Sequence, residues 1–362
     1  MKKDPIEICV VCRTGDSGLT DYSLCLIPEL ERHGRVTFVT ATTALKHPAR
    51  GNIEIVPIFR RMRHIYLDWF VFLRYALTQR PKIILMQSWL GFPFFDTFFI
   101  RFLKAFHIDL AITAHDILPH HPTPFSRFSC GLFFRSFDRI IAHSEASKEQ
   151  LLSMGVTAPI LVVPHGEYDV FNLDKLDRAE ARTRLGGIGN DEFVALFFGH
   201  LDQRKGLAEF LNVADSMGGR GIKFIVAGKD DLSPNYKGIL KRTWPEHIRA
   251  DVGHVPFEKV QEYFAAADAV ILPYREGTTS GVLKIAMAFG KPVIATPVGD
   301  IQETLGEWPG ILIPMENIED GLRKGIEKMM GQRSEYSAHA AESREHYSWA
   351  HIGARYVDFL LN

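Results

Sequence analysis

The stretch from residue 273 to residue 288 shows the clearest sign of chemistry in this sequence. It begins where an apolar run ends, passes two glycines and several hydroxyl residues, and enters an apolar helical pattern. A helix that begins after such a turn directs unpaired N–H groups and the positive end of its dipole at an anion, typically a phosphate. Glu276, at the end of the apolar run, can accept hydrogen bonds from sugar hydroxyls. The alternative is an ordinary helix N-cap at Thr279 or Ser280, which is compatible with phosphate binding.

A second candidate site lies between residues 197 and 206. An apolar run ends at Gly199, and two adjacent cations, Arg204 and Lys205, precede a new helix expected near Leu207. Arg offers a planar fork to phosphate oxygens, and Lys offers a mobile point charge. The pair suits a diphosphate leaving group, whose negative charge grows as a glycosidic bond breaks. The alternative is a solvated basic turn.

Two further loops follow apolar runs in the first half of the chain. One holds His115, Asp116, His120 and His121, which together could form a zinc site, although Pro119 disfavours the regular spacing of helical ligands. Any one of these histidines can instead be structural. The other loop holds Gly15, Asp16, Ser17 and Gly18, where glycines permit close approach of the backbone to a ligand. It lacks the GxGxxG spacing of dinucleotide-binding proteins.

Composition sets the broad class of the protein. The chain has 362 residues, 46% hydrophobic and 23% charged, which fits two soluble domains. A formal net charge of −1 gives no field to attract nucleic acid. The four cysteines form no disulfide framework, and Cys9 and Cys12, although spaced as CxxC, lie in an apolar run that reads as a buried strand, where they point to opposite faces. Without a signal-type start or a long apolar run, we expect a cytoplasmic protein.

The elements that must position these loops are short apolar runs alternating with helix-length stretches. Continuous apolar strands separated by helices predict parallel sheets covered on both faces, with ligands at the carboxyl ends of the strands. We therefore expect two doubly wound, Rossmann-like α/β domains facing across a cleft. The expected strands are residues 6–12, 36–40, 53–57, 83–87, 110–113, 139–143 and 160–163, then 193–198, 223–227, 269–272, 292–296 and 311–314.

The domain boundary is expected between residues 171 and 191, where a charged helical pattern leads into a glycine-rich run. We predict an acceptor-side domain over residues 1–175 and a donor domain over residues 176–345. Residues 346–362 are predicted to form an amphipathic helix that packs back on the first domain.

The order of these four loops resembles family 4 glycosyltransferases of the GT-B fold. The resemblance covers nearly the whole chain and is strongest from residue 197 to residue 296. It rests on Glu276-Gly277, on the run AMAFGKPVIAT at residues 286–296, and on Lys205-Gly206. The runs AHSEASK at residues 142–148, VPHG at residues 163–166 and AADAVILP at residues 266–273 resemble further family segments.

The resemblance implies a donor site in the second domain. In this family, cations hold the donor diphosphate, helix amides hold its phosphates, and a Glu with the amides after it grips the sugar hydroxyls. The matching positions are Arg204 and Lys205 for the diphosphate, Ser280, Gly281 and Val282 for the phosphates, and Glu276, Gly277, Thr278 and Thr279 for the sugar.

Other roles are also implied by the resemblance. His115 would contact the donor sugar from the first domain and act with Glu276 in catalysis, and residues 15–18 would line the cleft. The family retains anomeric configuration and needs no metal or other cofactor, which agrees with the lack of an Asp-x-Asp motif. The expected nucleotide contacts are Gly199, His200, Val255, Pro256 and Lys284.

Two positions depart from the family pattern. His200 stands where an Arg is usual, and Lys284 stands where a second Glu is usual. That Glu would accept hydrogen bonds from ribose hydroxyls, whereas Lys has no acceptor. Either another residue takes the ribose or the donor sits differently, and Lys284 could add a cation near the diphosphate. We expect Lys284→Glu to change donor affinity or nucleotide preference.

Residues 58–137 suggest where an acceptor arrives. Fifteen of the 26 phenylalanines lie between Phe59 and Phe137, and residues 58–107 hold eight Lys or Arg against two acids. This mixture suggests a surface that binds an anionic membrane or receives a glycan or lipid-linked acceptor. The protein would then be peripheral to the inner side of the plasma membrane. A Phe-rich core with a solvated basic rim is the alternative.

Taken together, the sequence predicts a retaining hexosyltransferase that uses a nucleotide-diphosphate sugar. A nucleotide-sugar epimerase or a sugar phosphorylase on the same fold is the nearest alternative enzyme. A nucleotide-sugar-binding protein without catalysis is the alternative of another class, since His200 and Lys284 depart from the family.

Overall fold

The computed structural model describes residues 6–48, 51–60, 62–119, 123–219, 221–233, 236–277 and 279–362, in two compact units. The first comprises Met1–Gly166 and Trp349–Asn362, and the second comprises Glu167–Ser348. Residues 167–175, expected in the first domain, fall in the second unit because Glu167 pairs with Arg344 and the Tyr168 amide donates to the Lys284 carbonyl at 3.0 Å.

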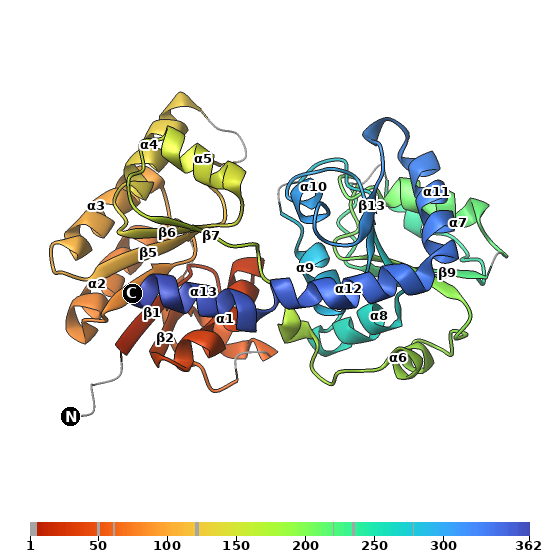
Figure 1. Ribbon diagram of the computed structural model, residues 1–362, viewed down its shortest axis with the longest axis horizontal. Coiled ribbons are helices and arrows are strands. Elements are labelled where there is room, and N and C mark those ends of the chain that lie inside the picture. Colours follow the sequence, from red (N-terminus) through yellow and green to blue (C-terminus); the bar gives the residue numbers. More distant parts are fainter. Residues whose placement is uncertain are drawn as a thin grey trace. The chain divides into compact units, whose positions relative to one another are not determined.

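The first unit is built on a parallel sheet. Among the described residues its order is β3-β2-β1-β4-β5-β6-β7, and the chain therefore winds outward in both directions from β1 (Figure 1). The near-continuous burial of β1 and β4 reflects helices on both faces. The strands are β1 (Ile6–Val11), β2 (Gly34–Ala41), β3 (Glu54–Phe59), β4 (Ile83–Met86), β5 (Asp109–Ala114), β6 (Arg139–Ala142) and β7 (Ile160–Val162).

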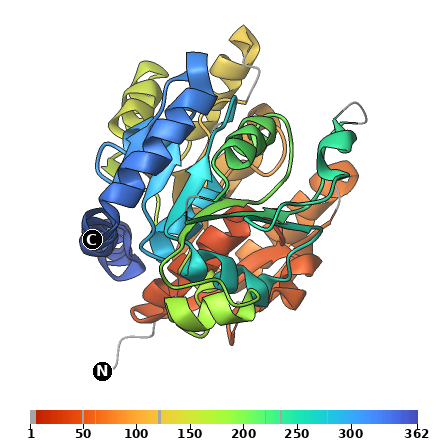
Figure 2. The same ribbon diagram turned by 90° about the vertical axis from the view of Figure 1, so that its right-hand side faces the viewer.

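The helices of this unit divide between the two faces of the sheet (Figures 1 and 2). One face meets a core that includes Trp69, Ile100, Phe133 and Leu151, contributed by four successive helices. On the other face α1 packs with α13, and the hydroxyls of Tyr22 and Tyr356 hydrogen-bond at 2.7 Å. The helices are α1 (Gly18–Glu31), α2 (Ile65–Gln79), α3 (Pro93–Lys104), α4 (Pro124–Phe134), α5 (Glu145–Ser153) and α13 (Trp349–Leu361).

The second unit has its own parallel sheet, in the order β10-β9-β8-β11-β12-β13 within the described residues. Its strands are β8 (Phe193–Phe198), β9 (Ile222–Gly228), β10 (Ile248–Val252), β11 (Ala269–Leu272), β12 (Val293–Ala295) and β13 (Gly310–Leu312). Its helices are α6 (Arg178–Arg184), α7 (Leu207–Ser216), α8 (Val260–Ala266), α9 (Gly281–Ala288), α10 (Ile301–Thr304), α11 (Ile318–Gly331) and α12 (Arg333–Tyr347). The expectation of two Rossmann-like α/β units is therefore confirmed.

Candidate functional site

In the second unit, the loops that follow β8 and β11 meet at the carboxyl edge of the sheet. The Arg275 amide donates to the Arg204 carbonyl at 2.7 Å. Gly206 has φ +72°, and a Cβ there would lie 2.0 Å from the Pro273 carbonyl oxygen, so only glycine permits this contact. Both segments singled out in the sequence therefore belong to one site.

The two cations of this site are held by Asp202. Its carboxylate accepts from the Lys205 amide at 2.9 Å and from Arg204 Nη2 at 2.9 Å. Lys205 Nζ lies 3.7 Å from the centroid of the Tyr274 ring, an attractive cation–π contact. Burial is the main cause that lowers the pKa of Lys205, and the Asp202 charge opposes it. A half-buried cation with few solvent contacts suits a strong interaction with a phosphate.

Helix α9 begins at this same edge. Ser280 is its N-cap, because its Oγ accepts from the Leu283 amide at 3.3 Å, and the same hydroxyl donates to Tyr274 Oη at 3.3 Å. The N-cap expected at Thr279 or Ser280 is thus Ser280. Among the described residues, the amides of Gly281 and Val282 have no acceptor. The first turn of α9 therefore presents two N–H groups.

Lys284 does not extend into solvent. Its side chain is 2% exposed, and Nζ lies 3.0 Å from Asp300 Oδ2 and 3.3 Å from Thr304 Oγ1. Asp300 Oδ1 also accepts from the Ser280 amide at 3.2 Å. One carboxylate, from the N-cap of α10, therefore contacts both the N-cap of α9 and Lys284.

The remaining residues of the predicted donor site have different surroundings. Glu276 and Thr279 are exposed at the end of the loop, and Thr278 lies outside the described residues. His200 is exposed and pairs with Asp231, and this hydrogen bond is the main cause that lowers the pKa of Asp231. Gly277 is also exposed, and a Cβ added to Gly199 would lie 3.2 Å from Val282 Cγ2. Val255 and Pro256 follow β10.

In the first unit, three histidines gather at the carboxyl ends of adjacent strands. His115 follows β5, His143 follows β6, and His165 follows β7. His115 Nδ1 and His143 Nε2 lie 3.3 Å apart, and one ring nitrogen from each of the three lies within 4.8 Å of the others. The edge of the Tyr22 ring packs on His115 and His165 at centroid distances of 4.6 and 4.8 Å.

Oxygen atoms orient each imidazole of this cluster. His115 Nε2 contacts Gln87 Oε1 at 3.1 Å, while Nδ1 of His143 and of His165 donate to the carbonyls of Val163 and Gly166. Burial, and secondarily the His143 charge, lower the pKa of His115 well below its usual value, so it is neutral at pH 7. A neutral imidazole with a fixed ring plane can exchange hydrogen bonds with a sugar hydroxyl.

This cluster was not predicted from the sequence. His115 was instead grouped with Asp116, His120 and His121, of which His120 and His121 lie outside the described residues. The available signal was that His143 and His165 also follow apolar strands, so parallel pairing brings them to the same edge.

The predicted cleft loop packs closely on its own unit. A Cβ on Gly15 would lie 2.4 Å from Thr43 Oγ1, so the glycine is required by packing. Asp16 is exposed, Ser17 is the N-cap residue of α1, and Gly18 is its first residue. This loop is therefore at the carboxyl end of β1, at the same sheet edge as His115.

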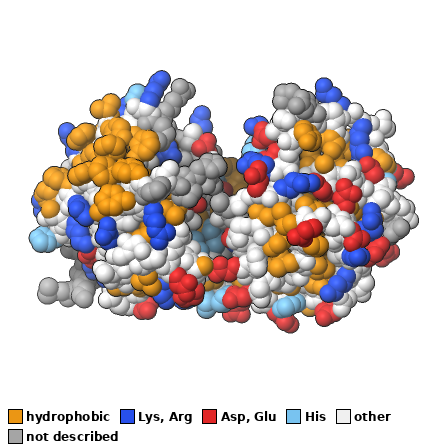
Figure 3. Space-filling view, turned by 90° about the horizontal axis from the view of Figure 1, so that it is seen from above, with side chains coloured by type: hydrophobic (Ala, Val, Ile, Leu, Met, Phe, Trp, Pro, Cys, Tyr) orange, Lys and Arg blue, Asp and Glu red, His pale blue; other side chains and the backbone are white. Residues whose placement is uncertain are grey.

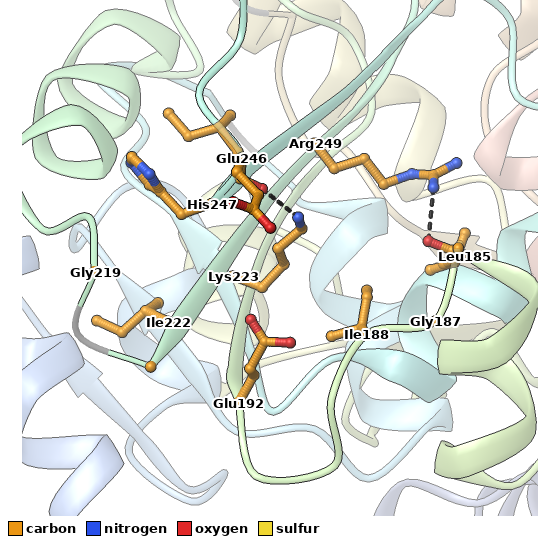
Figure 4. A pocket seen from close by; sticks show the side chains of 13 residues that line it. Leu185, Gly187, Ile188, Glu192, Gly219, Ile222, Lys223, Glu246, His247 and Arg249 are labelled. Carbon is orange, nitrogen blue, oxygen red and sulfur yellow. Dashed lines mark hydrogen bonds between the residues drawn. The ribbon is translucent and has the colours of Figure 1, made fainter.

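A pocket of about 690 Å³ lies elsewhere on the second unit (Figure 4). Its lining includes Ile222 and Ile248, the first residues of β9 and β10, and Arg249, which donates to the Leu185 carbonyl at 2.7 Å. Ligands of doubly wound sheets bind at the carboxyl ends of the strands, which is the opposite edge. We therefore assign the candidate site to the carboxyl edge and not to this pocket.

Both units of the chain are similar to known proteins. A family model described as "Glycosyltransferase Family 4" matches residues 17–166, and one described as "Glycosyl transferases group 1" matches residues 192–332. An uncharacterized glycosyltransferase of Methanocaldococcus jannaschii is 25% identical over 232 residues, 61% of this chain and 59% of the relative. A D-inositol 3-phosphate glycosyltransferase of Mycobacteroides abscessus is 26% identical over 226 residues, 59% of this chain and 49% of the relative. The match thus spans about half of these relatives.

Solved structures show the same fold over nearly the whole chain. Sucrose-phosphate synthase of Thermosynechococcus elongatus superimposes with a TM-score of 0.72 at 19% identity, covering 98% of both chains. HepE of Anabaena in complex with UDP-glucose gives a TM-score of 0.72 at 18% identity, covering 98% of this chain and 99% of HepE. The two matching family models together account for most of both units, and this chain belongs to the family 4 glycosyltransferases of the GT-B fold.

Proposed function

We propose that this protein is a retaining glycosyltransferase that transfers a hexose-type sugar from a nucleotide-diphosphate sugar, without a metal. The observation that carries the proposal is that Lys205 and Ser280, the N-cap of α9, both contact Tyr274 at one sheet edge. A cation and two N–H groups there match the charge of a diphosphate. HepE, which shares the fold, was solved with UDP-glucose bound.

In this proposal the residues act mainly by electrostatics. Lys205 and Arg204 stabilise the negative charge that develops on the diphosphate as the glycosidic bond breaks. The amides of Gly281 and Val282 bind the phosphate oxygens. Glu276 accepts hydrogen bonds from hydroxyls of the donor sugar, and neutral His115 exchanges hydrogen bonds with a sugar hydroxyl.

Asp300 takes the ribose role in this proposal. Lys284 has no acceptor atom, but its ion pair holds the Asp300 carboxylate beside the N-cap of α9. The carboxylate is part exposed, so its oxygens can accept from ribose hydroxyls. Gly199, His200, Val255 and Pro256 would contribute the other nucleotide contacts.

We further propose that the acceptor is a glycan, a lipid-linked sugar or a small molecule, and that the enzyme works in the cytoplasm, peripheral to a membrane. Within the described residues, no helix is both long and apolar enough to cross a bilayer. Support for the membrane comes from the exposed apolar side chains of α2, α3 and α4 and the cations beside them.

The experiment is a thermal-shift screen of UDP-, GDP- and ADP-sugars, followed by turnover assays with and without acceptors. A ligand of the native state raises the unfolding temperature. We expect Glu276→Ala and His115→Ala to lose turnover while donor binding persists, and Glu316→Ala, an exposed glutamate elsewhere, to match wild type.

Four outcomes would contradict the proposal. Binding of no nucleotide sugar would remove the donor site altogether. Conversion of the donor without acceptor would identify an epimerase, and dependence on inorganic phosphate would identify a phosphorylase. Donor binding with no turnover for any acceptor class would favour the binding protein.

A further inference from the structure

The first unit carries an unusual number of exposed apolar side chains on three helices, which we call the aromatic face. Phe70, Phe98 and Phe125 are 62%, 61% and 61% exposed, one on each of α2, α3 and α4. Figure 3 shows this apolar surface, with Lys and Arg side chains beside it. The aromatic face comprises Tyr66, Leu67, Phe70, Val71, Phe92, Phe95, Phe98, Phe102, Phe106, Phe125 and Phe128.

Ring contacts make the aromatic face continuous from helix to helix. Tyr66 of α2 meets Phe95 of α3 with centroids 5.7 Å apart. Phe94 of α3 meets Phe125 of α4 at 5.8 Å, and it also meets Phe98 at 5.6 Å. Single exposed apolar residues need no explanation, but a contiguous patch across three elements marks an interaction surface.

These side chains are not needed by the core. Each helix already buries a separate apolar stripe, with Trp69 and Phe72 on α2 and Ile100 and Leu103 on α3 fully buried. Helix α2 is therefore apolar on both its inner and its outer side. A helix apolar all round belongs in a buried or lipid environment.

The charges on these helices are of one sign at the surface. Between residues 63 and 107 the two acids, Asp68 and Asp96, are 1% and 0% exposed, and each accepts hydrogen bonds inside the unit. All the exposed charged residues in this stretch are Lys or Arg. They are Arg63, Arg74, Arg80, Lys82, Arg101 and Lys104, of which Lys104 forms an ion pair with Asp138 at 2.6 Å.

We propose that the aromatic face docks on an anionic lipid bilayer, with its rings in the interfacial region and its cations on the lipid phosphates. Apolar burial and cationic attraction add in this kind of binding. A second copy of the chain is a poor partner, because a symmetric contact would bring the cations of two copies together. Docking is independent of the proposed sugar transfer. The idea that a lipid carries the acceptor rests on that proposed transfer.

Sedimentation with vesicles tests the docking. We expect the protein to pellet with equimolar phosphatidylcholine and phosphatidylglycerol, to bind phosphatidylcholine alone much more weakly, and to release at high salt. Arg74→Gln and Arg101→Gln should each weaken binding roughly fivefold. Phe98→Ser with Phe125→Ser should abolish it, since both rings are exposed and the fold does not depend on them.

Matched controls lie on the second unit. Leu312→Ser removes an apolar side chain that is 43% exposed, and Lys241→Gln removes an exposed cation; both should bind like wild type. Wild-type protein that stays in the supernatant at low salt would overturn the proposal. So would a wild-type dimer in light scattering that Phe98→Ser dissociates, since the face would then bind a second copy.

The same variants separate this inference from the proposed function. Phe98→Ser with Phe125→Ser should keep donor binding and turnover of a water-soluble acceptor, while turnover of an acceptor embedded in vesicles falls. Equal loss for both acceptors would place the aromatic face in the catalytic machinery and would contradict the docking role.

Discussion

Lys205 lies half-buried over the Tyr274 ring, with its backbone fixed by Asp202. Lys205→Met keeps the apolar stem but removes the charge that would face the diphosphate. We expect donor binding to weaken by roughly 10- to 100-fold, the range of one charge-assisted hydrogen bond. Calorimetric titration of the donor measures this, with Lys229→Met as the control at a more exposed cation. Equal affinities in the two variants would exclude Lys205 from the donor site.

Lys284 requires a different experiment from the one that the sequence suggested. Lys284→Glu would set a second carboxylate against Asp300 in a buried position, so we expect a loss of about 3 kcal/mol in the free energy of unfolding. Adding Asp300→Asn should recover most of that loss, measured by urea denaturation. Nucleotide preference is then compared between the double variant and Asp300→Asn alone, because Asp300 is itself proposed to bind the ribose. A stable single variant would contradict the buried ion pair.

How far residues could be predicted depended on their separation in the sequence. Glu276 and Ser280 were singled out because one local pattern contains both a strand end and a helix start. Asp300 was not found because it approaches Lys284 only through the fold. The grouping of His143 and His165 with His115 likewise depends on which strands pair, and single residues do not reveal strand order.

At the scale of elements, Asp96 of α3 holds α2 and the loop before α3 together. Its carboxylate accepts from Trp69 Nε1 at 2.9 Å and from the amides of Leu90 and Gly91 at 3.0 and 2.8 Å. Burial nevertheless raises the pKa of Asp96 from 3.8 to about 6, while these hydrogen bonds oppose the rise. The folded protein therefore holds this proton more tightly than the unfolded chain does.

A pH dependence of stability follows from Asp96. Between its unfolded and folded pKa values the folded state binds more protons, so the free energy of unfolding falls as pH rises. Asp96→Asn removes this contribution. We expect the stability of wild type relative to the variant to fall by about 3 kcal/mol between about pH 4 and about pH 7, measured by urea denaturation. A difference that is flat or rises with pH would contradict the burial of this carboxyl.

Most strands could be predicted because they are continuous apolar runs, as a sheet covered on both faces requires. The exception is β10, which no predicted strand covered. It reads Ile248-Arg249-Ala250-Asp251-Val252, and Arg249 Nε donates to Asp251 at 2.6 Å. β10 is an edge strand and is only half-buried, so it carries charged residues in place of the continuous apolar run by which the other strands were predicted. The charged helical pattern at the predicted domain boundary corresponds to α6, which starts at Arg178.

For the whole molecule, the second unit is an insertion into the first. Its two ends meet, since the Glu167 amide donates to the Tyr347 carbonyl at 3.1 Å. In the first unit, a Cβ on Gly166 would lie 2.6 Å from the Trp349 ring, so the two segments of that unit also meet. In each unit, the two chain ends at the insertion point therefore lie next to each other.

We expect each unit to fold separately when it is produced with its full set of elements. Residues 167–348 should unfold cooperatively in urea, and so should residues 1–166 joined to residues 349–362 by a short Gly-Ser linker. Residues 1–166 alone should be markedly less stable, because they lack Tyr356 of α13, whose buried hydroxyl hydrogen-bonds to Tyr22 and Thr113. Equal stability with and without residues 349–362 would contradict the role of α13.

The position of α13 also sets an order of events during translation. The ribosome makes the strands of the first unit, then the whole second unit, and only then the helix that supplies Tyr356 and Trp349. Because domains fold as units during synthesis, the second unit is completed before the first. The aromatic face and the histidine cluster therefore emerge early on an unfinished scaffold, and a chaperone would be needed longest by the part of the protein that is made first.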